Sequence, residues 1–497
     1  MKKKSFIGCL LAVSLLCMSG CGGGGDSQAS VSNHREDKNY YFSFGVYGDP
    51  QVGADDSPQD YSVNSEKAIR MTMEYFQKEG MDAIVSVGDV IDYCEYNGLP
   101  GTAYDKFNEI LDEVFGERDE NGVRTEAPIM LHTLGNHEFS GFNHTDSASW
   151  YWDYSGEAAV DIFCEKLNTE LIQVYENYGY TIITANMSEC RGKFSDESKQ
   201  KIEAALKTAS ADDPWRPIFM TTHYVPQDTI YHSDWISDDD AWLSNLLKQY
   251  PQVILFTGHT HNPLNDPRII SQKDYTVVNA GCNEYASLPD LSADGIKYDN
   301  VLNAVETDEN NPGSFNADWC SVHHGLVVDV YGNRTVITRV DFETEKTFGE
   351  PIVIYKYQSK DDFDYVQYYD HAAQRYVVSE ELKDLAAAPE FGEEAAAKAS
   401  AKFSEGTLTV AFEDAEIARK GNGRITLNDI VECYTIRAYS AADKLLEEKT
   451  YISRYWLNDD RDFNYTKRIS MSESPAYVEI IPRDAYGIEG TALRIEL

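Results

Sequence analysis

The chain has 497 residues and a formal net charge of −40 at pH 7. A nucleic-acid backbone would be repelled by so acidic a protein, so the composition argues against nucleic-acid binding and indicates a soluble, acidic surface. The length suggests more than one domain and is ample for a sizeable hydrophobic core.

The first 40 residues differ in composition from the rest of the chain. Lysines at positions 2–4 precede an apolar run, Phe6–Met18, that is too short to span a bilayer as a stable helix. Ser19, Gly20 and Cys21 follow, and this arrangement resembles a bacterial lipoprotein signal in which Cys21 would carry the lipid; ordinary signal cleavage nearby is the alternative. We expect a signal peptide over 1–21, a flexible tether over 22–39, and an exported protein whose lipid anchors it in the bacterial cell envelope.

The cysteines follow no recognisable framework. Six lie beyond the leader, namely Cys94, Cys164, Cys190, Cys282, Cys320 and Cys433. Their scattered spacing leaves disulfides and buried free thiols equally open, although export permits disulfides. No CxxC pair occurs, so zinc bound by cysteines is not supported.

Strand and helix patterns alternate through the first half of the chain. Strand patterns occupy Tyr41–Val46, Ala83–Val87, Pro128–Leu134, Tyr180–Ala185, Pro217–Thr222 and Val253–Phe256, and helical patterns occupy Ser65–Lys78, Tyr104–Phe115, Asp196–Thr208 and about Asp238–Lys248. This alternation predicts a mostly parallel sheet. An aromatic-rich insertion, Ser140–Gly179, interrupts it and forms either a local core or a wall of a substrate cleft.

Polar residues follow five of these strand patterns. The five stretches are Gly48-Asp49-Pro50-Gln51, Gly88-Asp89-Val90-Ile91-Asp92, Gly135-Asn136-His137-Glu138, His223-Tyr224 and Gly258-His259-Thr260-His261. Each one alone has a plain interpretation as a turn or a structural histidine. Because sites in open α/β sheets assemble at the carboxyl ends of strands, five in series indicate a functional site.

The donor atoms of these stretches suit divalent metal ions. The candidate ligands are Asp49, Gln51, Asp89, Asn136, His223, His259 and His261. Oxygen and imidazole donors without a thiolate favour Mn, Fe, Zn or similar ions. Seven ligands exceed the needs of one ion, and a bridging carboxylate would divide them between two ions about 3.5–4 Å apart, which is an arrangement suited to phosphoryl transfer.

In this order, the five stretches resemble the calcineurin-like metallophosphoesterase superfamily, over about Tyr40–Tyr355. The resemblance implies one ion held by Asp49, Gln51, Asp89 and His261, and a second held by Asp89 as the bridge, Asn136, His223 and His259. It also implies that His137 protonates the leaving alkoxide or stabilises charge on the phosphate. Asp92 would support the site from outside the ligand set, and the fold would be a four-layer α/β/β/α sandwich.

Two positions depart from the wider superfamily. Gln51 stands where many members have His, although a subset of the family carries Asp-Pro-Gln. Asp92 stands where purple acid phosphatases have a tyrosine ligand, so we exclude that branch. His132, His144, His232, His323 and His324 lie outside the motifs, and we expect them to be structural; a position at the border of the cleft is the alternative for the pair at 323–324.

The expected function is that of a metallophosphoesterase, a hydrolase acting on phosphoric ester bonds. The resemblance implies two divalent ions (Mn, Fe, Zn or Mg) and attack on phosphorus by a hydroxide that bridges them. Export favours small extracellular phosphate esters as substrates, with diesters slightly ahead. The alternative is a non-catalytic cell-surface binding protein that retains an inactive phosphoesterase fold.

The C-terminal part predicts a separate domain. Val327–Val340 reads as a hairpin that closes a catalytic domain over 40–357, and 358–401 reads as a helical or irregular linker. Strand patterns then occupy Thr407–Phe412, Tyr434–Tyr439, Lys449–Tyr455, Tyr465–Ser470, Tyr477–Ile481 and Leu493–Leu497. They indicate a small all-β sandwich over 402–497, loosely similar to fibronectin-III or Ig-like modules. It has no catalytic constellation, so we expect it to pack on the catalytic domain, shape the cleft, or contact a protein or glycan.

Overall fold

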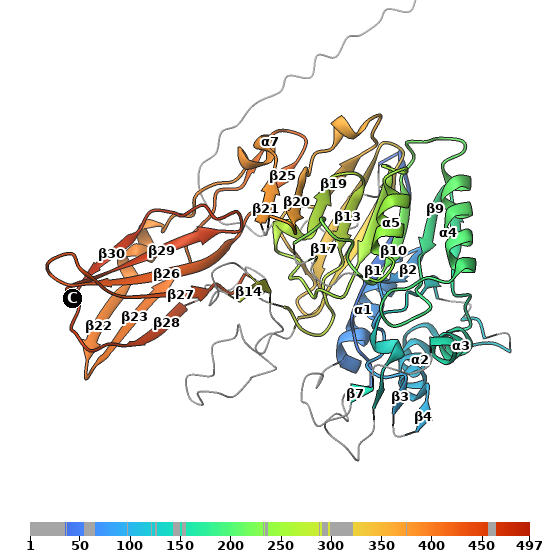
Figure 1. The fold of residues 1–497 in the computed structure, drawn as a ribbon, viewed down its shortest axis with the longest axis horizontal. Helices are drawn as coiled ribbons and strands as arrows, with labels where there is room; N and C mark the ends of the chain where they lie inside the picture. Colours follow the sequence, from blue (N-terminus) through green and yellow to red (C-terminus); the bar gives the residue numbers. More distant parts are fainter. Residues whose placement is uncertain are drawn as a thin grey trace, which may run out of the picture.

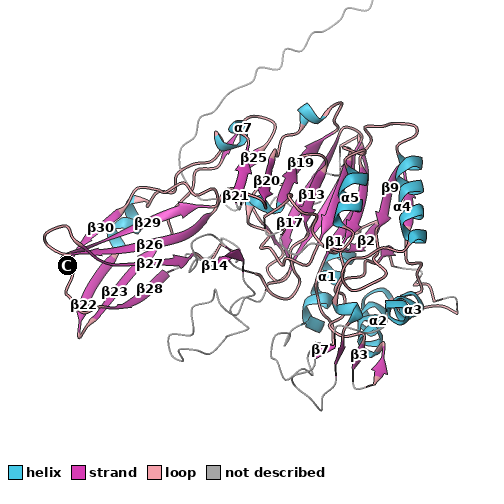
Figure 2. Cartoon of the chain, in the orientation of Figure 1, coloured by secondary structure: helices cyan, strands magenta, loops and turns pink. Residues whose placement is uncertain are grey.

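The computed structural model describes residues 35, 37–53, 65–96, 98–120, 122–124, 127–142, 150–151, 156–231, 233, 237–287, 289–290, 297–298, 322–373, 375–455 and 464–497. Figure 1 shows an α/β part on the right and an elongated part made of strands on the left, and Figure 2 shows that the longer helices belong to the α/β part. Within the described ranges, no helix is long and apolar enough to cross a membrane. The expected signal peptide with Cys21, and nearly all of the tether before residue 37, lie outside these residues.

The α/β part is built on two sheets. The first has the order β18 (Lys346–Thr347), β17 (Arg334–Asp341), β16 (His324–Tyr331), β1 (Tyr40–Tyr47), β2 (Ala83–Ser86) and β5 (Ile129–Leu131), with β19 (Ile352–Tyr355) paired to β17. The second has the order β12 (Ile270–Gln272), β13 (Thr276–Asn279), β11 (Val253–Thr257), β10 (Ile218–Thr222), β9 (Tyr180–Thr184) and β8 (Val174–Asn177).

Both sheets are mixed, which corrects the expectation of a mostly parallel sheet. β1, β2 and β5 run parallel to one another in the first sheet, and β9, β10, β11 and β13 run parallel to one another in the second. The five strands that precede the motif loops, namely β1, β2, β5, β10 and β11, all belong to these parallel sets. The pairs β8–β9, β12–β13 and β16–β17, the last being the predicted hairpin, are antiparallel because a short turn joins their strands, and β16 also pairs antiparallel with the distant β1. The parallel strands therefore direct their carboxyl ends toward the motif loops.

A hydrophobic core between the two sheets holds them face to face. Phe42, Phe44 and Val46 alternate along β1 and point into this core. The Phe44 ring centroid lies 5.0 Å from that of Phe219 on β10 and 5.9 Å from that of Phe256 on β11. Edge-on aromatic pairs of this kind add specific geometry to the burial of apolar surface.

Helices cover the outer face of each sheet. Ile69, Met73 and Phe76 form the buried stripe of one helix against the first sheet, and Ile202 and Leu206 form that of another against the second. The helices are α1 (Ser65–Glu79) and α2 (Thr102–Phe115) on the first sheet, and α4 (Asp196–Ala209) and α5 (Asp240–Leu247) on the second. The predicted four-layer α/β/β/α sandwich is confirmed.

The predicted insertion forms small elements beside the first sheet. They are β6 (Gly141–Phe142), β7 (Trp150–Tyr151) and α3 (Gly156–Leu167), whereas β8 at the end of the insertion joins the second sheet. β6 and β7 form a separate short sheet with β3 (Glu95–Tyr96) and β4 (Leu99–Pro100), which precede the insertion, and Phe163 of α3 packs against Tyr104 of α2 with ring centroids 6.4 Å apart. This part of the insertion is therefore local core, as one of the two interpretations expects.

Between 358 and 401 the structure differs from the expected helical or irregular linker. A hairpin of β20 (Gln367–Asp370) and β21 (Arg375–Val378) precedes two short helices, α7 (Glu380–Lys383) and α8 (Glu393–Lys398). The Gln367 side chain donates hydrogen bonds to the carbonyls of Pro267 and Ile270 at 2.8 and 2.9 Å. Docking against the α/β part thus decides the conformation, and local sequence pattern does not contain that information.

The C-terminal strands form the predicted all-β sandwich. One sheet has the order β22 (Ser400–Ser404), β23 (Thr407–Glu413) and β28 (Asn464–Ser470); the other has the order β27 (Leu445–Ile452), β26 (Val431–Tyr439), β29 (Tyr477–Asp484) and β30 (Leu493–Glu496). Leu408, Val410, Ile436 and Ile480 are among the side chains buried between them. Before the sandwich proper, β24 (Lys420–Gly421) and β25 (Thr426–Leu427) form a short hairpin.

We expect the Gln367→Ala variant to lower the free energy of unfolding by about 2–4 kcal/mol, because it leaves the buried carbonyls of Pro267 and Ile270 without their donor. Denaturant unfolding measures the change. Gln249→Ala is the matched control, since the Gln249 side chain donates to Asn245 O at an exposed site, and it should change stability by less than about 0.5 kcal/mol. Equal effects of the two variants would show that the hairpin is not docked.

Candidate metal centre

The structure brings all seven predicted ligands to one place. They follow strands of both sheets: Asp49 and Gln51 follow β1, Asp89 follows β2, Asn136 follows β5, His223 follows β10, and His259 and His261 follow β11. Each of these side chains belongs to a residue that is at most 8% exposed. The centre therefore spans the carboxyl-end edges of the two facing sheets, as sites in α/β folds commonly do.

The backbone is strained at five of these seven positions. Asp49, Gln51, Asp89, His259 and His261 have φ angles of 54°, 47°, 50°, 68° and 49°. Residues other than glycine rarely adopt this left-handed region, at a cost of about 1–3 kcal/mol each. Such strain persists only where surrounding contacts enforce it, and here it turns each side chain inward directly after a strand.

His223 lies at the centre of one group of donors. Its Nε2 atom is 3.1 Å from Asp89 Oδ2, 3.0 Å from Asn136 Oδ1 and 3.1 Å from His259 Nδ1. Its Nδ1 atom faces the carbonyl of Val87 at 3.0 Å, so Nε2 is the nitrogen that faces the three other atoms. One proton on Nε2 cannot satisfy three acceptors, whereas a cation can be shared by all four atoms. This donor set therefore fits a metal ion.

A second group of donors is centred on Asp49. His261 Nε2 lies 3.2 Å from Asp49 Oδ1, and the backbone N–H of His259 donates to the same carboxylate at 3.0 Å. Gln51 lies on the side of His137, with its Nε2 atom 3.2 Å from His137 Nε2. Asp89, whose carboxylate faces both His223 and His137, is the residue between the two groups.

His137 is held beside the candidate ligands by two carboxylates. Its Nδ1 atom is 2.7 Å from Asp92 Oδ1, and its backbone N–H donates to Asp89 Oδ1 at 2.9 Å. Burial by itself would lower the pKa of the imidazole, but the charges of Asp89 and Asp92 outweigh it and raise the pKa of His137 to about 10. The imidazole is therefore protonated at neutral pH in the ion-free protein, and 14% of this side chain is exposed to solvent.

The buried charges are strongly coupled. Burial would raise the pKa of Asp89, but His223 and His137 hold it below its usual range. Burial would lower the pKa of His223, and Asp89 instead raises it to about 9. Burial and the neighbouring His223 both lower the pKa of His259. A low-pKa carboxylate among neutral and charged imidazoles is an electrostatic environment that accepts divalent ions in exchange for protons.

The carboxylate of Glu138 links two motif loops through hydrogen bonds. It accepts hydrogen bonds from the backbone N–H groups of Gly135 at 2.6 Å, Asp89 at 3.1 Å, Val90 at 2.6 Å and Ile91 at 3.2 Å. The first donor lies in the loop after β5 and the other three in the loop after β2. Burial and the charge of Asp89 raise the pKa of Glu138 to about 7, and the N–H donors oppose that rise.

Gly135 permits the close approach of these two loops. A Cβ atom on this residue would lie 2.0 Å from Asp89 Oδ1 and 2.5 Å from Asp89 N. Both atoms belong to a residue that cannot move without displacing its hydrogen bonds to His137 and Glu138. The glycine of the Gly-Asn-His-Glu stretch is therefore required by contact with the neighbouring loop.

Three further residues that support the site were not recognised from the sequence. Asn186 accepts from Leu134 N at 2.7 Å, and Asn279 donates to Gly258 O at 3.2 Å and to Thr260 Oγ1 at 3.0 Å. Cys282 places its sulfur 3.3 Å from His261 Nδ1. Asn186 and Asn279 also lie at the ends of strands β9 and β13, so the strand-end criterion could have identified both of them.

The remaining polar candidates have structural positions or lie outside the description. Cys94, Cys282 and Cys433 are buried thiols, Cys164 is a half-buried thiol, the half-buried Cys190 donates to Asn136 O at 3.8 Å, and Cys320 lies outside the described residues. His132, His323 and His324 are buried, at 2–4% exposure; His144 and His232 are not described. The interpretation as buried free thiols is thus confirmed for Cys94, Cys282 and Cys433.

We expect the Gly135→Ala variant to weaken binding of divalent ions and to lower the free energy of unfolding by about 1–3 kcal/mol, because the added methyl group displaces Asp89. Metal titration and denaturant unfolding measure the two effects. Gly392→Ala is the control: it introduces only an ordinary contact, with Glu416 Oε1 at 3.5 Å. Unchanged ion binding in Gly135→Ala would contradict the close approach of the two loops.

A comparison with protein families matches the region that contains the five motif loops. A model of the calcineurin-like phosphoesterase family matches residues 42–263. A search of curated proteins found no match.

Several solved structures are similar at low identity. A dimetal phosphatase from Danio rerio is 12% identical, with a TM-score of 0.41 over 64% of this chain and 100% of that one. GAP50, the anchor in the inner membrane complex of Plasmodium, is 13% identical, with a TM-score of 0.36 over 65% and 90%. The purple acid phosphatase PPD1 from yellow lupin is 14% identical, with a TM-score of 0.41 over 65% and 55%. We draw no functional conclusion from likenesses this distant. The family match and the order of the five motif loops identify residues 42–263 as a calcineurin-like phosphoesterase domain.

Proposed function

We propose that this protein is an exported, metal-dependent phosphoesterase that hydrolyses small phosphate esters. The observation that carries the proposal is the convergence of carboxylate, amide and imidazole donors from both sheets beside the hydrogen-bonded pair of His137 and Asp92. Ligands alone would suit a structural ion, but a structural ion has no need of an adjacent acid that is partly open to solvent. The family match over residues 42–263 supports the same conclusion.

The donors divide into two proposed sites. The first site consists of Asp49, Gln51, Asp89 and His261, and the second site of Asp89, Asn136, His223 and His259. Two divalent ions bound there, of Mn, Fe, Zn or Mg, would supply positive charge to the phosphate oxygens and activate a water molecule at neutral pH. Asp89 is assigned to both sites by the resemblance to the family; its carboxylate faces His223 of the second site at 3.1 Å and His137, which neighbours Gln51 of the first site, at 3.9 Å.

The residues around these sites control protonation and geometry. Asp92 fixes the orientation of His137 through Nδ1 and so directs Nε2 toward the candidate ligands Gln51 and Asp89. The proton on His137 Nε2 can be given to the oxygen of the departing alcohol, which would otherwise leave as an alkoxide. Both Asp89 and Asp92 raise the pKa of His137; if bound ions offset the charge of Asp89, Asp92 would still stabilise the protonated imidazole.

The leader and the composition complete the proposal. Residues 1–21 resemble a lipoprotein signal, and we propose that Cys21 anchors the mature chain, through tether 22–39, in the bacterial cell envelope. An exported location favours scavenging of small extracellular esters, and we place diesters slightly ahead of monoesters. We propose a catalytic domain over 40–357 and a β-sandwich over 402–497 that takes no part in the chemistry.

We expect metal-stripped protein to hydrolyse bis-p-nitrophenyl phosphate once Mn, Zn, Fe or Mg is restored, and Asp89→Asn to abolish turnover because both sites lose a charged ligand. The ratio of rates on this diester and on p-nitrophenyl phosphate assigns the substrate class. Ions bound without any turnover on either ester would indicate a narrow natural substrate. Neither ions nor turnover would favour the alternative, a non-catalytic surface binding protein.

We expect His137→Gln to slow hydrolysis of an ester with an alkyl alcohol leaving group by about 10²–10⁴-fold, because the alkoxide then departs without a proton. The same variant should slow p-nitrophenyl phosphate far less, since p-nitrophenolate leaves readily without protonation. Rates on the two leaving groups, measured with equal ion occupancy, provide the test. An equal loss on both substrates would assign His137 to phosphate binding instead of acid catalysis.

A further inference from the structure

The loop after β13 lies against two candidate ligands of the first site, His261 and Asp49. We name Cys282–Ser287 the bracket loop. Three of its residues touch His261: the Cys282 sulfur lies 3.3 Å from Nδ1, the Tyr285 ring centroid lies 4.3 Å from the imidazole centroid, and Ser287 N donates to His261 O at 2.9 Å. Because Nδ1 faces sulfur, Nε2 is the nitrogen directed at Asp49, 3.2 Å away.

The bracket loop also holds the backbone that carries Asp49. Asn283 N donates to Gly48 O at 3.0 Å, and the Cys282 thiol donates to Asp49 O at 3.5 Å. The same sulfur accepts the backbone N–H groups of Glu284 at 3.3 Å and Tyr285 at 3.4 Å. Cys282 is 0% exposed and thus joins two ligands of the first site to the rest of its own loop.

The other face of the bracket loop packs on the C-terminal part. One hydrophobic cluster contains Cys282 and Ala286 of the loop together with Ile430, Ile452 and Tyr455. Ile452 is the last residue of β27, and Ile430 directly precedes β26. The sandwich and its connections therefore share one buried hydrophobic cluster with the cysteine that contacts His261.

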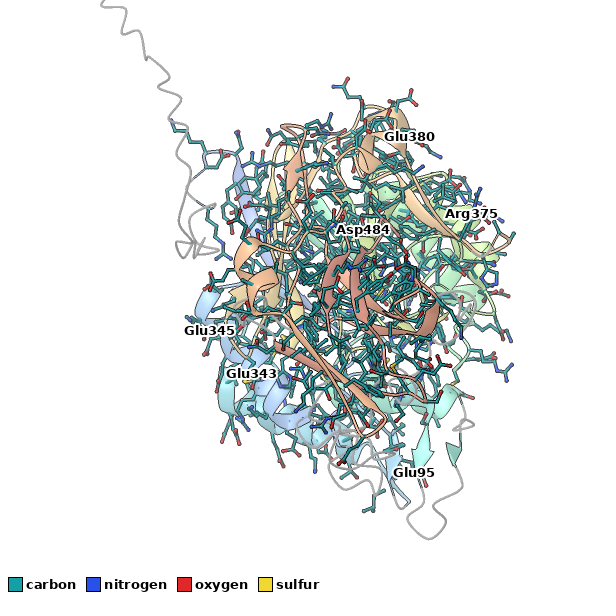
Figure 3. The ribbon with its side chains drawn as sticks, turned by 90° about the vertical axis from the view of Figure 1, so that its left-hand side faces the viewer. Glu95, Glu343, Glu345, Arg375, Glu380 and Asp484 are labelled. Atoms are coloured by element: carbon teal, nitrogen blue, oxygen red, sulfur yellow. The ribbon has the colours of Figure 1, made fainter. Side chains whose placement is uncertain are left out.

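Charged contacts fix the two parts beside this cluster. Arg268, which is 1% exposed, donates to Asp266 on its own side at 2.6 Å and to Glu432 of β26 at 2.8 Å. It also donates to Ala485 O at 2.8 Å. In Figure 3 the neighbouring Asp484 lies near the middle of the view among dense side chains, whereas Glu343, Glu345 and Glu380 lie toward the rim. The contact is buried and specific in orientation.

The second site is supported differently. His223 Nδ1 faces Val87 O at 3.0 Å, the Tyr224 ring lies 4.4 Å from the His259 ring, and Cys190 donates to Asn136 O at 3.8 Å. All of these supporting residues belong to the α/β part. A disturbance from the C-terminal part should therefore reach the two sites unequally.

We propose that the C-terminal β-sandwich is a positioning element for the first site, and that Cys282 is the positioning residue through which it acts on His261. The inference rests on the proposed function, because it presumes that ions bind. The partner of the second ring nitrogen sets the tautomer and orientation of a metal-binding histidine, and its loss typically lowers metal affinity by about 10–100-fold. Packing by Ile430, Ile452 and Tyr455 holds that partner in place.

The test is the affinity of each ion, measured by titrating Mn into metal-stripped full-length protein, in variants whose folding is checked by thermal unfolding. We expect Cys282→Ala to bind one of two ions about 10–100-fold more weakly and the other as in the wild type. Cys282→Ser should recover most of the loss, because a hydroxyl can accept from Nδ1. Ile430→Ala should weaken the same ion, and the control Ile436→Ala, equally apolar but buried inside the sandwich, should weaken neither.

The outcomes separate this inference from the proposed function. Wild-type binding of two ions, with Cys282→Ala identical to it or weakened equally at both sites, overturns the inference and leaves the proposed function standing. Equal ion affinities in Ile430→Ala and Ile436→Ala would show that the sandwich does not position the first site. A wild-type protein that binds no ion overturns the proposed function and this inference together.

Discussion

The arrangement of the centre depends on one buried carboxylate. Glu138 accepts four backbone N–H groups, one from the loop after β5 and three from the loop after β2. Burying a charge without partners is costly, whereas four donors on two oxygens provide the compensation that makes the burial tolerable. The same bonds hold Asp89 at a positive φ angle and keep Asn136 and His137 beside it. Several candidate site residues thus share one internal anchor.

Elsewhere in the centre, the backbone angles and the polar contacts both depart from what residues ordinarily prefer. Five candidate ligands have left-handed backbone, and the donor atoms around His223 approach to 3.0–3.1 Å although they cannot all be satisfied by protons. Strain and unbalanced donors both destabilise the folded protein in the absence of a cation. Because proteins concentrate such local violations at functional positions, these two independent features agree on where the chemistry would occur.

The sequence predicted the elements whose signals are local. Alternation on Phe42, Phe44 and Val46, and an abrupt polar residue after each buried run, are visible without a structure, and the C-terminal strands have the same clarity. The hydrogen bonds that support the site join residues far apart in the sequence. Asn186 bonds Leu134, Asn279 bonds Gly258, and Cys282 bonds Asp49, more than 200 positions away. The hairpin β20–β21 is likewise decided by docking, through the Gln367 side chain. The positions of Asn186 and Asn279 after strands are visible in the sequence, but the partners of these side chains, and those of Cys282 and Gln367, are not.

The contact between the two parts bears on what the C-terminal sandwich is for. A module that only recruited a glycan or a protein would need no more than a tether, and a buried ion pair would add a desolvation cost without benefit. Instead, Arg268 lies buried between Asp266 and Glu432, seven residues after His261 in the chain. Buried charges specify one orientation more strictly than they add stability. This interface fixes the orientation of the sandwich relative to the α/β part, and it lies against the bracket loop, which contacts His261 and Asp49. Candidate ligands with a strained backbone require rigid surroundings of this kind.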